Sequence, residues 1–403
     1  MTHPVIVIGA GPVGLAAAAH LIEDGIEPLV LEAGPEPGHS IRDWAHVGLF
    51  TEWDLVIDPA SARLLEASGW AIPPPDEYPS GGDLVEKYLE PLAAALGDRI
   101  QVDHRVTAVS RQNVDKVVTD GREQIPFLVR AETNKGPVEF LADSVIDASG
   151  TWLTPNPLGS SGLPAIGEDT TQNIRYWIPD VLGRERDRYQ GKRVLVVGAG
   201  HSAANVLLDL AELALEDPAT VPVWAIRRHD ASKAYGAMED DELPARGKVG
   251  MELRHRVEAS RIELEADFQV RRLEDSEGKV EVTGSASDGS QRTLTVDEIV
   301  VATGQRPNLA MTRELRLELD PWLEAPVALA PLIDPNVHTC LTVPPHGVKQ
   351  LSHPEPGFYT VGIKSYGRAP TFLMATGYEQ VRSVAAAIAD DWEAATRTDL
   401  KLR

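Results

Sequence analysis

The feature that most constrains this chain is a strand, glycine turn, helix and strand pattern that occurs twice, far apart in the sequence. Each copy has a short apolar run, a turn with small residues at fixed spacing, a helix-forming stretch and a second apolar run. The first copy covers residues 5–8, 9–14, 15–22 and 28–31, and the second covers 193–197, 198–203, 204–215 and 221–226. Two such βαβ units predict an α/β protein with two Rossmann-like three-layer domains.

The first turn reads Gly9-Ala10-Gly11-Pro12-Val13-Gly14 and fits the pattern G-x-G-x-x-G. In this pattern the first glycine allows a tight turn, the second lets a pyrophosphate approach the backbone closely, and the third lets the helix pack on the strand. The helix N-terminus then presents unpaired N–H groups to the phosphates. Glu32, followed by Ala33, ends the second strand. A carboxylate there accepts hydrogen bonds from an adenosine ribose, so these residues predict a dinucleotide with an unmodified ribose.

The second turn reads Gly198-Ala199-Gly200-His201-Ser202-Ala203 and fits the G-x-G-x-x-A variant. Its second strand ends with Arg227 and Arg228 in place of an acid. Guanidinium groups suit a ribose 2′-phosphate, which a carboxylate would repel. The pair therefore predicts NADPH, and the alternative is a solvated strand end. We expect His201 and Ser202 to contact phosphate, or Ser202 simply to cap the first helical turn.

Two dinucleotide sites in one chain indicate two different cofactors, because a pyridine nucleotide cannot usefully pass hydride to an identical neighbour. A flavin accepts hydride, holds it, and releases the electrons to oxygen or to a substrate. We therefore expect FAD at the first turn and NADPH at the second. The chain is predicted to be an enzyme, an FAD-dependent NADPH oxidoreductase.

This layout resembles the flavoproteins with two dinucleotide-binding domains, which include flavin-containing monooxygenases, Baeyer–Villiger monooxygenases and the glutathione- or thioredoxin-reductase group. The resemblance is carried by the two glycine turns and by two strand ends, Ala148-Ser149-Gly150 and Ala302-Thr303-Gly304. It implies an NADPH-binding domain (156–307) inserted in a discontinuous FAD-binding domain (1–155 and 308–403). The crossings between them are expected near Thr154–Thr171 and Gln305–Asn308.

The monooxygenase-like branch is the more similar one. The resemblance implies FAD contacts from the loop 38–44, the strand that follows the helix 83–89, and the last strand end. The residues expected to bind FAD in these places are Ser40, Arg42, Trp44, Val106, Ala148, Ser149, Gly150, Gly362 and Lys364. Two departures stand out: no histidine lies between Trp152 and Gly198, where these monooxygenases carry a fingerprint, and Cys340 is the only cysteine.

The C-terminal part is predicted to contain a strand at Phe358–Val361 and a helix from about Pro370 to Ala389, with Pro370 in its first turn. By the resemblance, this helix points its N-terminus at the flavin. Lys364 and Arg368 are candidates to stabilise negative charge on the reduced ring, and the alternative is a solvated cationic loop. His346 is a candidate for the active-site mouth, although a surface-loop position is more expected. Trp44, Phe50 and Trp53 are candidates to stack near the flavin, although such residues more often belong to the core.

Composition limits the partners. The chain carries 38 Lys and Arg against 61 Asp and Glu, a formal charge of -23. Such a chain repels nucleic-acid backbones and anionic lipid surfaces. We expect no signal peptide, and the sequence shows no apolar run of membrane-spanning length and no histidine spacing typical of a metal site. We expect a cytoplasmic protein without a metal, with a homodimer as the default assembly.

The leading functional hypothesis is a monooxygenase-like oxidation of a small-molecule substrate, with hydride transfer to the flavin and reaction with oxygen. One alternative is a reductase or oxidase that passes electrons from NADPH to a quinone, a metal species or oxygen. Another is a non-catalytic flavin-binding sensor.

Overall fold

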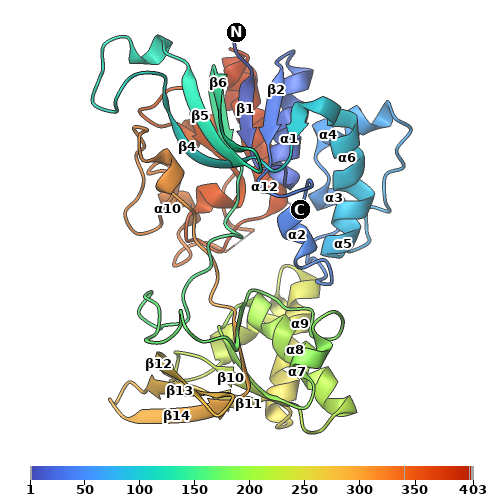
Figure 1. The fold of residues 1–403 in the computed structure, drawn as a ribbon. Helices are drawn as coiled ribbons and strands as arrows, with labels where there is room; N and C mark the ends of the chain where they lie inside the picture. Colours follow the sequence, from blue (N-terminus) through green and yellow to red (C-terminus); the bar gives the residue numbers. More distant parts are fainter. Residues whose placement is uncertain (1, 340, 399, 401–403) are drawn as a thin grey trace. The chain divides into compact units, whose positions relative to one another are not determined.

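The chain separates into two compact units in the computed structural model, which describes residues 2–339, 341–398 and 400 (Figure 1). Unit 1 comprises Met1–Ala45, Thr51–Thr154 and Arg306–Arg403, and unit 2 comprises His46–Phe50 and Pro155–Gln305. The long insertion thus begins and ends at 154/155 and 305/306, where the sequence predicts 155/156 and 307/308. The assignment of the short segment 46–50 to unit 2 was not foreseen. Cys340 lies outside the described residues.

A parallel five-stranded sheet forms the centre of unit 1, in the order β16-β7-β1-β2-β3. Its strands are β1 (Val5–Ile8), β2 (Pro28–Leu31), β3 (Ile100–Gln101), β7 (Ser144–Asp147) and β16 (Phe358–Thr360). Val5 of β1 pairs with Pro28 of β2 and with Ser144 of β7. All four residues of β1 are buried, as expected for a parallel strand covered on both faces.

Helices cover this sheet together with a small antiparallel sheet. The helix α1 (Pro12–Glu23) packs against α4 (Pro59–Glu66) and α12 (Met374–Ile388). The antiparallel strands are β4 (Arg105–Arg111), β5 (Phe127–Thr133) and β6 (Gly136–Ala142). One apolar core joins the two sheets through Ile6, Ile8, Val109, Phe127 and Phe358.

The remaining elements of unit 1 are short. The α-helices are α2 (His39–Arg42), α3 (Trp53–Val56), α5 (Gly81–Leu84), α6 (Glu90–Leu96), α10 (Ala330–Ile333), α11 (Val348–Leu351) and α13 (Trp392–Thr396). Val85–Leu89 forms a π-helical turn, and 3₁₀ turns lie at Gly97–Arg99, Arg122–Gln124, Ala310–Thr312 and Gly362–Tyr366.

Unit 2 repeats the same plan. Its parallel sheet has the order β11-β10-β9-β15-β8. The strands are β8 (Ile174–Tyr176), β9 (Arg193–Val197), β10 (Val221–Ala225), β11 (Glu263–Glu265) and β15 (Glu298–Val301). The helical elements are α7 (Arg186–Tyr189), α8 (His201–Glu216), α9 (Pro244–Glu258) and the 3₁₀ turns Ser232–Tyr235 and Met238–Asp240. An antiparallel sheet of β12 (Gln269–Ser276), β13 (Lys279–Ser285) and β14 (Gln291–Val296) packs on the parallel sheet through Phe268, Val282 and Val301.

The predicted fold class is confirmed, while the C-terminal boundaries differ from the prediction. The strand ends at Thr360 and the helix α12 begins at Met374, so Pro370 lies outside the helix. Leu373 still has an extended backbone, and the ring of Phe372 packs edge-on against Tyr366 at 5.2 Å between ring centroids. Packing of this segment therefore delays the helix beyond the proline. Within the described ranges, no helix is long and apolar enough to cross a membrane.

Candidate functional site

The first glycine turn is closed on one side and open on the other. Gly9 has a φ of 98°, and a Cβ there would lie 2.8 Å from the carbonyl oxygen of Ala148. A Cβ on Gly14 would lie 1.9 Å from the carbonyl oxygen of Gly9. At Gly11, by contrast, an added Cβ meets nothing within 4 Å. Gly11 caps α1 and Pro12 is its first residue, so the open side is where a diphosphate can approach the helix N-terminus.

Glu32 ties the end of β2 to this turn. Its Oε2 accepts the N–H of Ala10 at 2.7 Å, and its Oε1 accepts the N–H of Gly34 at 2.8 Å. Each carboxylate oxygen has a second lone pair. The side chain is therefore held in place and still able to accept hydrogen bonds from a ribose.

A buried ion pair lies at the end of β7, the strand that pairs with β1 on the side opposite to β2. The Nζ of Lys364 lies 2.7 Å from Oδ2 of Asp147 and donates to Oγ of Ser149 at 2.9 Å. The hydroxyl of Ser149 donates in turn to Oδ1 of Asp147 at 2.7 Å. Lys364 is 2% exposed and Asp147 is fully buried. Ser149 and Gly150 belong to the predicted strand end, and Gly150 has a φ of 68°.

The turn that carries Lys364 is held by an interior hydrogen-bond network. Gly362 has a φ of 67° and donates its N–H to Oε1 of Gln380 at 2.7 Å, while a Cβ there would press on Val13 at 3.3 Å. The Nε2 of Gln380 lies 2.9 Å from Oγ of Ser365 and 2.9 Å from Nε2 of His346. Because the amide nitrogen is the donor in this pair, His346 accepts there.

His346 is an interior residue and not the surface-loop residue that was expected. It is 3% exposed, and its Nδ1 lies 3.0 Å from the carbonyl oxygen of Pro344, to which it donates. Burial lowers the pKa of His346, although the carbonyl of Pro344 and the charge of Glu379 oppose this effect. The neutral imidazole therefore supports the Gly362–Tyr366 turn through Gln380.

The other residues expected around the flavin are placed as follows. Arg368 is exposed, so the alternative of a solvated cationic loop describes Arg368 but not Lys364. Arg42 pairs with Glu36 at 2.9 Å and with Glu90 at 2.8 Å. Ser40 lies within α2, Val106 lies in β4, and the ring of Trp44 packs on Trp152 with 6.4 Å between centroids.

The second glycine turn has the same geometry as the first. Gly198 has a φ of 147°, and a Cβ there would lie 2.1 Å from the carbonyl oxygen of Ala302. A Cβ on Gly200 meets nothing within 4 Å. Gly200 is the N-cap of α8 and His201 is its first residue. The alternative that Ser202 caps this helix is therefore wrong. Ala203, the third small residue of the turn, is buried. The strand end beside the turn is fixed by Thr303, whose Oγ1 donates to Asn156 O at 2.9 Å, and it finishes at Gly304 with a φ of 84°.

Arg227 and Arg228 follow β10 and are both exposed. The Nη1 of Arg227 donates to the carbonyl oxygen of Ser160 at 3.1 Å. Among the described residues, the side chain of Arg228 makes no hydrogen bond or ion pair. This difference makes Arg228 the more available of the two guanidinium groups for an anion.

Two further aromatic residues were candidates to stack near the flavin. Trp53 is 2% exposed and belongs to the core of unit 1. The ring of Phe50 packs in unit 2 against His201, with 5.2 Å between centroids.

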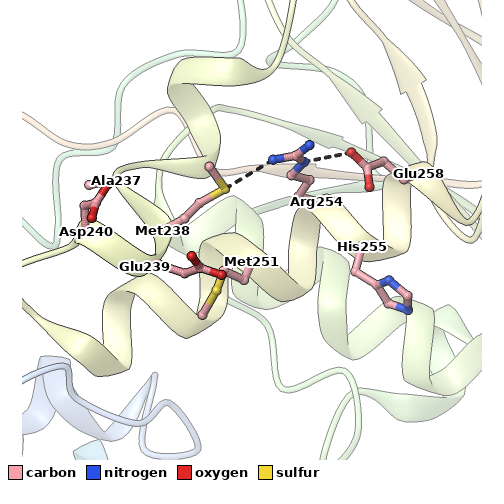
Figure 2. Close-up of a pocket in the computed structure, with 8 residues that line it drawn as sticks. All are labelled: Ala237, Met238, Glu239, Asp240, Met251, Arg254, His255 and Glu258. Atoms are coloured by element: carbon pink, nitrogen blue, oxygen red, sulfur yellow. Dashed lines mark hydrogen bonds and ion pairs between the residues drawn. The ribbon is translucent and has the colours of Figure 1, made fainter.

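A hollow of about 320 Å³ also lies in unit 2, between α9 and the segment that precedes it (Figure 2). Arg254 bridges its rim, bonded to Glu258 at 2.7 Å and in contact with the sulfur of Met238 at 3.8 Å. None of the predicted site residues lines it. In the part of the chain that is described, no group of three His, Cys, Asp or Glu could hold a metal ion.

Sequence reasoning missed Asp147, and a signal for it was available. The strand ends 145–150 and 299–304 have matching patterns, and Asp147 stands where the second copy has Val301. An acid in a buried parallel strand needs a cationic partner, so the mismatch between the two copies points to one. Gln380 had no comparable signal, because its partners lie on segments brought together only by folding.

Comparisons with known proteins agree with this geometry. The sequence profile described as pyridine nucleotide-disulphide oxidoreductase matches residues 6–327. A ferredoxin–NADP reductase of Rhodospirillum rubrum is 25% identical over 94% of this chain and 89% of its own length. Senecionine N-oxygenase of Tyria jacobaeae is 28% identical over 52% of this chain and 44% of its own length. The solved bacillithiol disulfide reductase of Bacillus cereus has a TM-score of 0.72 at 19% identity, covering 96% of this chain and 99% of that one.

The two open glycine turns fit the cofactors FAD and NADP(H) of this group, and both cofactor predictions are confirmed at the level of the family. The prediction of an enzyme is confirmed in the same way. The chain therefore belongs to the pyridine nucleotide-disulphide oxidoreductase family and is an FAD-dependent NADPH oxidoreductase.

Proposed function

We propose that this enzyme oxidises a small molecule with oxygen, using electrons that NADPH delivers to FAD. The observation that carries the proposal is the single cysteine of the chain. A redox-active pair of cysteines cannot form within one chain that has only Cys340. The electrons therefore leave the flavin for an acceptor other than a cysteine pair of this chain, and the relative named as an N-oxygenase supports oxygen as that acceptor.

The residues of the first turn are assigned to FAD. The backbone N–H groups of Gly11 and Val13 receive the diphosphate, since Pro12 between them has no N–H, and Glu32 accepts hydrogen bonds from the ribose hydroxyls. At the second turn, Gly200 and His201 receive the diphosphate of NADPH. When bound, FAD supplies two-electron acceptance and the reaction of its reduced ring with oxygen.

Lys364 is assigned the role of stabilising negative charge on the reduced ring. An ammonium group has three N–H donors, of which two are directed at Asp147 and Ser149. In a buried setting a fixed cation stabilises a nearby anion far more than it would in water. We assign the remaining N–H to the flavin. Asp147 and Ser149 hold the ammonium group so that it does not have to reorganise when that charge develops.

A second candidate is a reductase that passes electrons from NADPH to an external acceptor. The similarity to the ferredoxin–NADP reductase of Rhodospirillum rubrum favours this candidate, because it extends over 94% of this chain. The acceptor would be a redox protein, a quinone or a metal species.

An anaerobic titration with NADPH, followed by admission of oxygen, tests these proposals in order. We expect the flavin absorbance of the purified protein to bleach with one equivalent of NADPH. Oxygen and NADPH should then be consumed together only when an oxidisable amine is supplied, with little hydrogen peroxide. Steady peroxide release without a substrate would indicate an oxidase. Slow reoxidation by oxygen combined with rapid reduction of ferricyanide would indicate the reductase. A flavin that stays oxidised would contradict all three.

A further inference from the structure

A five-residue segment taken from early in the sequence forms part of unit 2. The chain leaves unit 1 after Ala45, packs within unit 2 over His46–Phe50, and returns to unit 1 at Thr51. We call residues 46–50 the strap. Its two ends are anchored on different parts of unit 2.

One anchor is the ring of Phe50, which lies against the imidazole of His201. The two ring centroids are 5.2 Å apart and the ring planes meet at 66°, an edge-on contact. His201 is the first residue of α8 and follows the open Gly200 directly. Phe50 thus packs on the side chain nearest the unpaired N–H groups of this helix.

The other anchor is His46, which lies beside the carbonyl of Pro179 and the charged side chains of Asp180 and Arg184. Burial lowers the pKa of His46, Asp180 opposes the shift, and Arg184 adds to it. The segment that carries Asp180 and Arg184 is itself held in place, because Oδ2 of Asp180 accepts the N–H of Arg184 at 3.1 Å. A short strap held at both ends restricts where the ring of Phe50 can lie.

His201 is held neutral in this setting. Burial lowers its pKa, the guanidinium of Arg246 lowers it further, and only Asp241 opposes them. A neutral imidazole contributes to a phosphate site through one directed N–H rather than through charge. Its contribution then depends on ring orientation, which is what an edge-on aromatic contact fixes.

We propose that Phe50 is a positioning residue for the pyridine nucleotide, orienting the His201 imidazole toward the diphosphate at the N-terminus of α8. This inference rests on the proposed function, since it takes the second glycine turn as the NADPH site. The diphosphate is common to NADPH and NADH, whereas the 2′-phosphate is present only in NADPH. Loss of Phe50 must therefore weaken both nucleotides by the same factor.

The test uses the FAD-loaded protein and measures the Kd of NADP⁺ and of NAD⁺ by calorimetry, with KM and kcat for flavin reduction. We expect Phe50→Ala to raise both Kd values by about 2- to 12-fold, the range of one aromatic contact, with KM rising more than kcat falls. Phe50→Trp should restore binding. Arg228→Ala should weaken NADP⁺ only.

The matched control is Phe140→Ala in unit 1. Phe140 makes a comparable contact with His104, at 5.8 Å between centroids, and its loss should leave both Kd values unchanged. Should Phe50→Ala fold poorly, His201→Ala provides the same test. In the double variant Phe50→Ala/His201→Ala, the two losses should not add.

Unchanged affinity in Phe50→Ala, or additive losses in the double variant, would overturn the positioning role while the NADPH assignment stands. A loss confined to NADP⁺ would overturn it as well, because it would place Phe50 at the 2′-phosphate. Failure of the NADPH assignment, on which the proposed function depends, looks different: the unaltered protein would bind neither nucleotide, and the inference would fall with it.

Discussion

Glu355 offers the sharpest test of what holds unit 1 together. Its fully buried carboxylate lies 2.8 Å from Nε of Arg111 and 2.9 Å from Nη2 of Arg122, and it also accepts the N–H of Arg316 at 3.1 Å. Arg111 ends β4, and Arg122 lies in the loop before β5. One carboxylate thus joins the antiparallel sheet to two segments of the C-terminal part of the chain.

The perturbation is Glu355→Gln, which removes the charge and keeps most of the shape. Both guanidinium groups are buried, with side-chain exposures of 2% for Arg111 and 4% for Arg122. Removing one member of a buried ion pair leaves an uncompensated charge in the interior and costs about 3–5 kcal/mol. We expect the free energy of unfolding of the FAD-loaded protein to fall by this amount.

Denaturant unfolding, followed by tryptophan fluorescence and by flavin release, measures the change. The matched control is Glu139→Gln in the same antiparallel sheet. Glu139 pairs with Arg130 at 2.6 Å, but the two side chains are 47% and 52% exposed. An exposed pair of this kind contributes about 0–1 kcal/mol. Equal effects of the two substitutions would refute the reasoning.

The same site predicts a pH dependence. Burial by itself raises the pKa of Glu355, but the hydrogen bonds from Arg122, Arg111 and the Arg316 N–H outweigh it and hold the pKa below its ordinary value of 4.5. A lowered folded-state pKa gives stability that is present above the unfolded-state value. That stability is lost as the pH falls through the lowered value. Unfolding measured between about pH 6 and pH 3 should show a larger loss of stability in the unaltered protein than in Glu355→Gln, in which only the other carboxyl groups titrate.

Three further predictions concern the two cofactor sites. Lys364→Met leaves the carboxylate of Asp147 buried without its cation, so denaturant unfolding should show a free energy of unfolding lower by about 3–5 kcal/mol. The double variant Lys364→Met/Asp147→Asn should recover part of this loss. An unchanged unfolding midpoint in Lys364→Met would contradict the pairing. Arg228→Ala should lower kcat/KM for NADPH by about 10-fold or more and leave NADH within about 2-fold, while equal losses would place Arg228 elsewhere. Gly198→Ala puts a Cβ 2.1 Å from Ala302 O, so NADP⁺ binding should disappear while flavin absorbance persists, and retained NADP⁺ affinity would argue against this turn.

The parts of the fold that sequence predicted well are those that local rules determine. Each glycine turn needs a positive φ at its first residue, and Gly9 and Gly198 both have one. The two βαβ units follow from the apolar runs on either side. The discontinuous organisation was an expectation from the resemblance, and contacts within the chain divide it at 154/155 and 305/306.

The parts that sequence did not predict depend on contacts between distant segments. His346 sits in the sequence Pro344-Pro345-His346-Gly347, which is typical of an exposed loop, yet Gln380 of α12 gives it a buried partner. The start of α12 was placed at a proline, whereas the packing of Phe372 decides it. Nothing in the five residues of the strap indicates that they pack in unit 2, because the residues that they contact lie more than 100 positions away in the sequence.

The order of the strands in unit 1 has a consequence for how the chain is made. The strand β1 precedes the main segment of unit 2 in the sequence, while β16, at Phe358–Thr360, follows it and completes the same sheet. The helix α1 likewise packs against α12, which also follows unit 2 in the sequence. Unit 2 has nearly all of its residues in one continuous stretch and can reach its native state on the ribosome first. The sheet of unit 1 is therefore completed, and α1 fully covered, only after unit 2 has been synthesised.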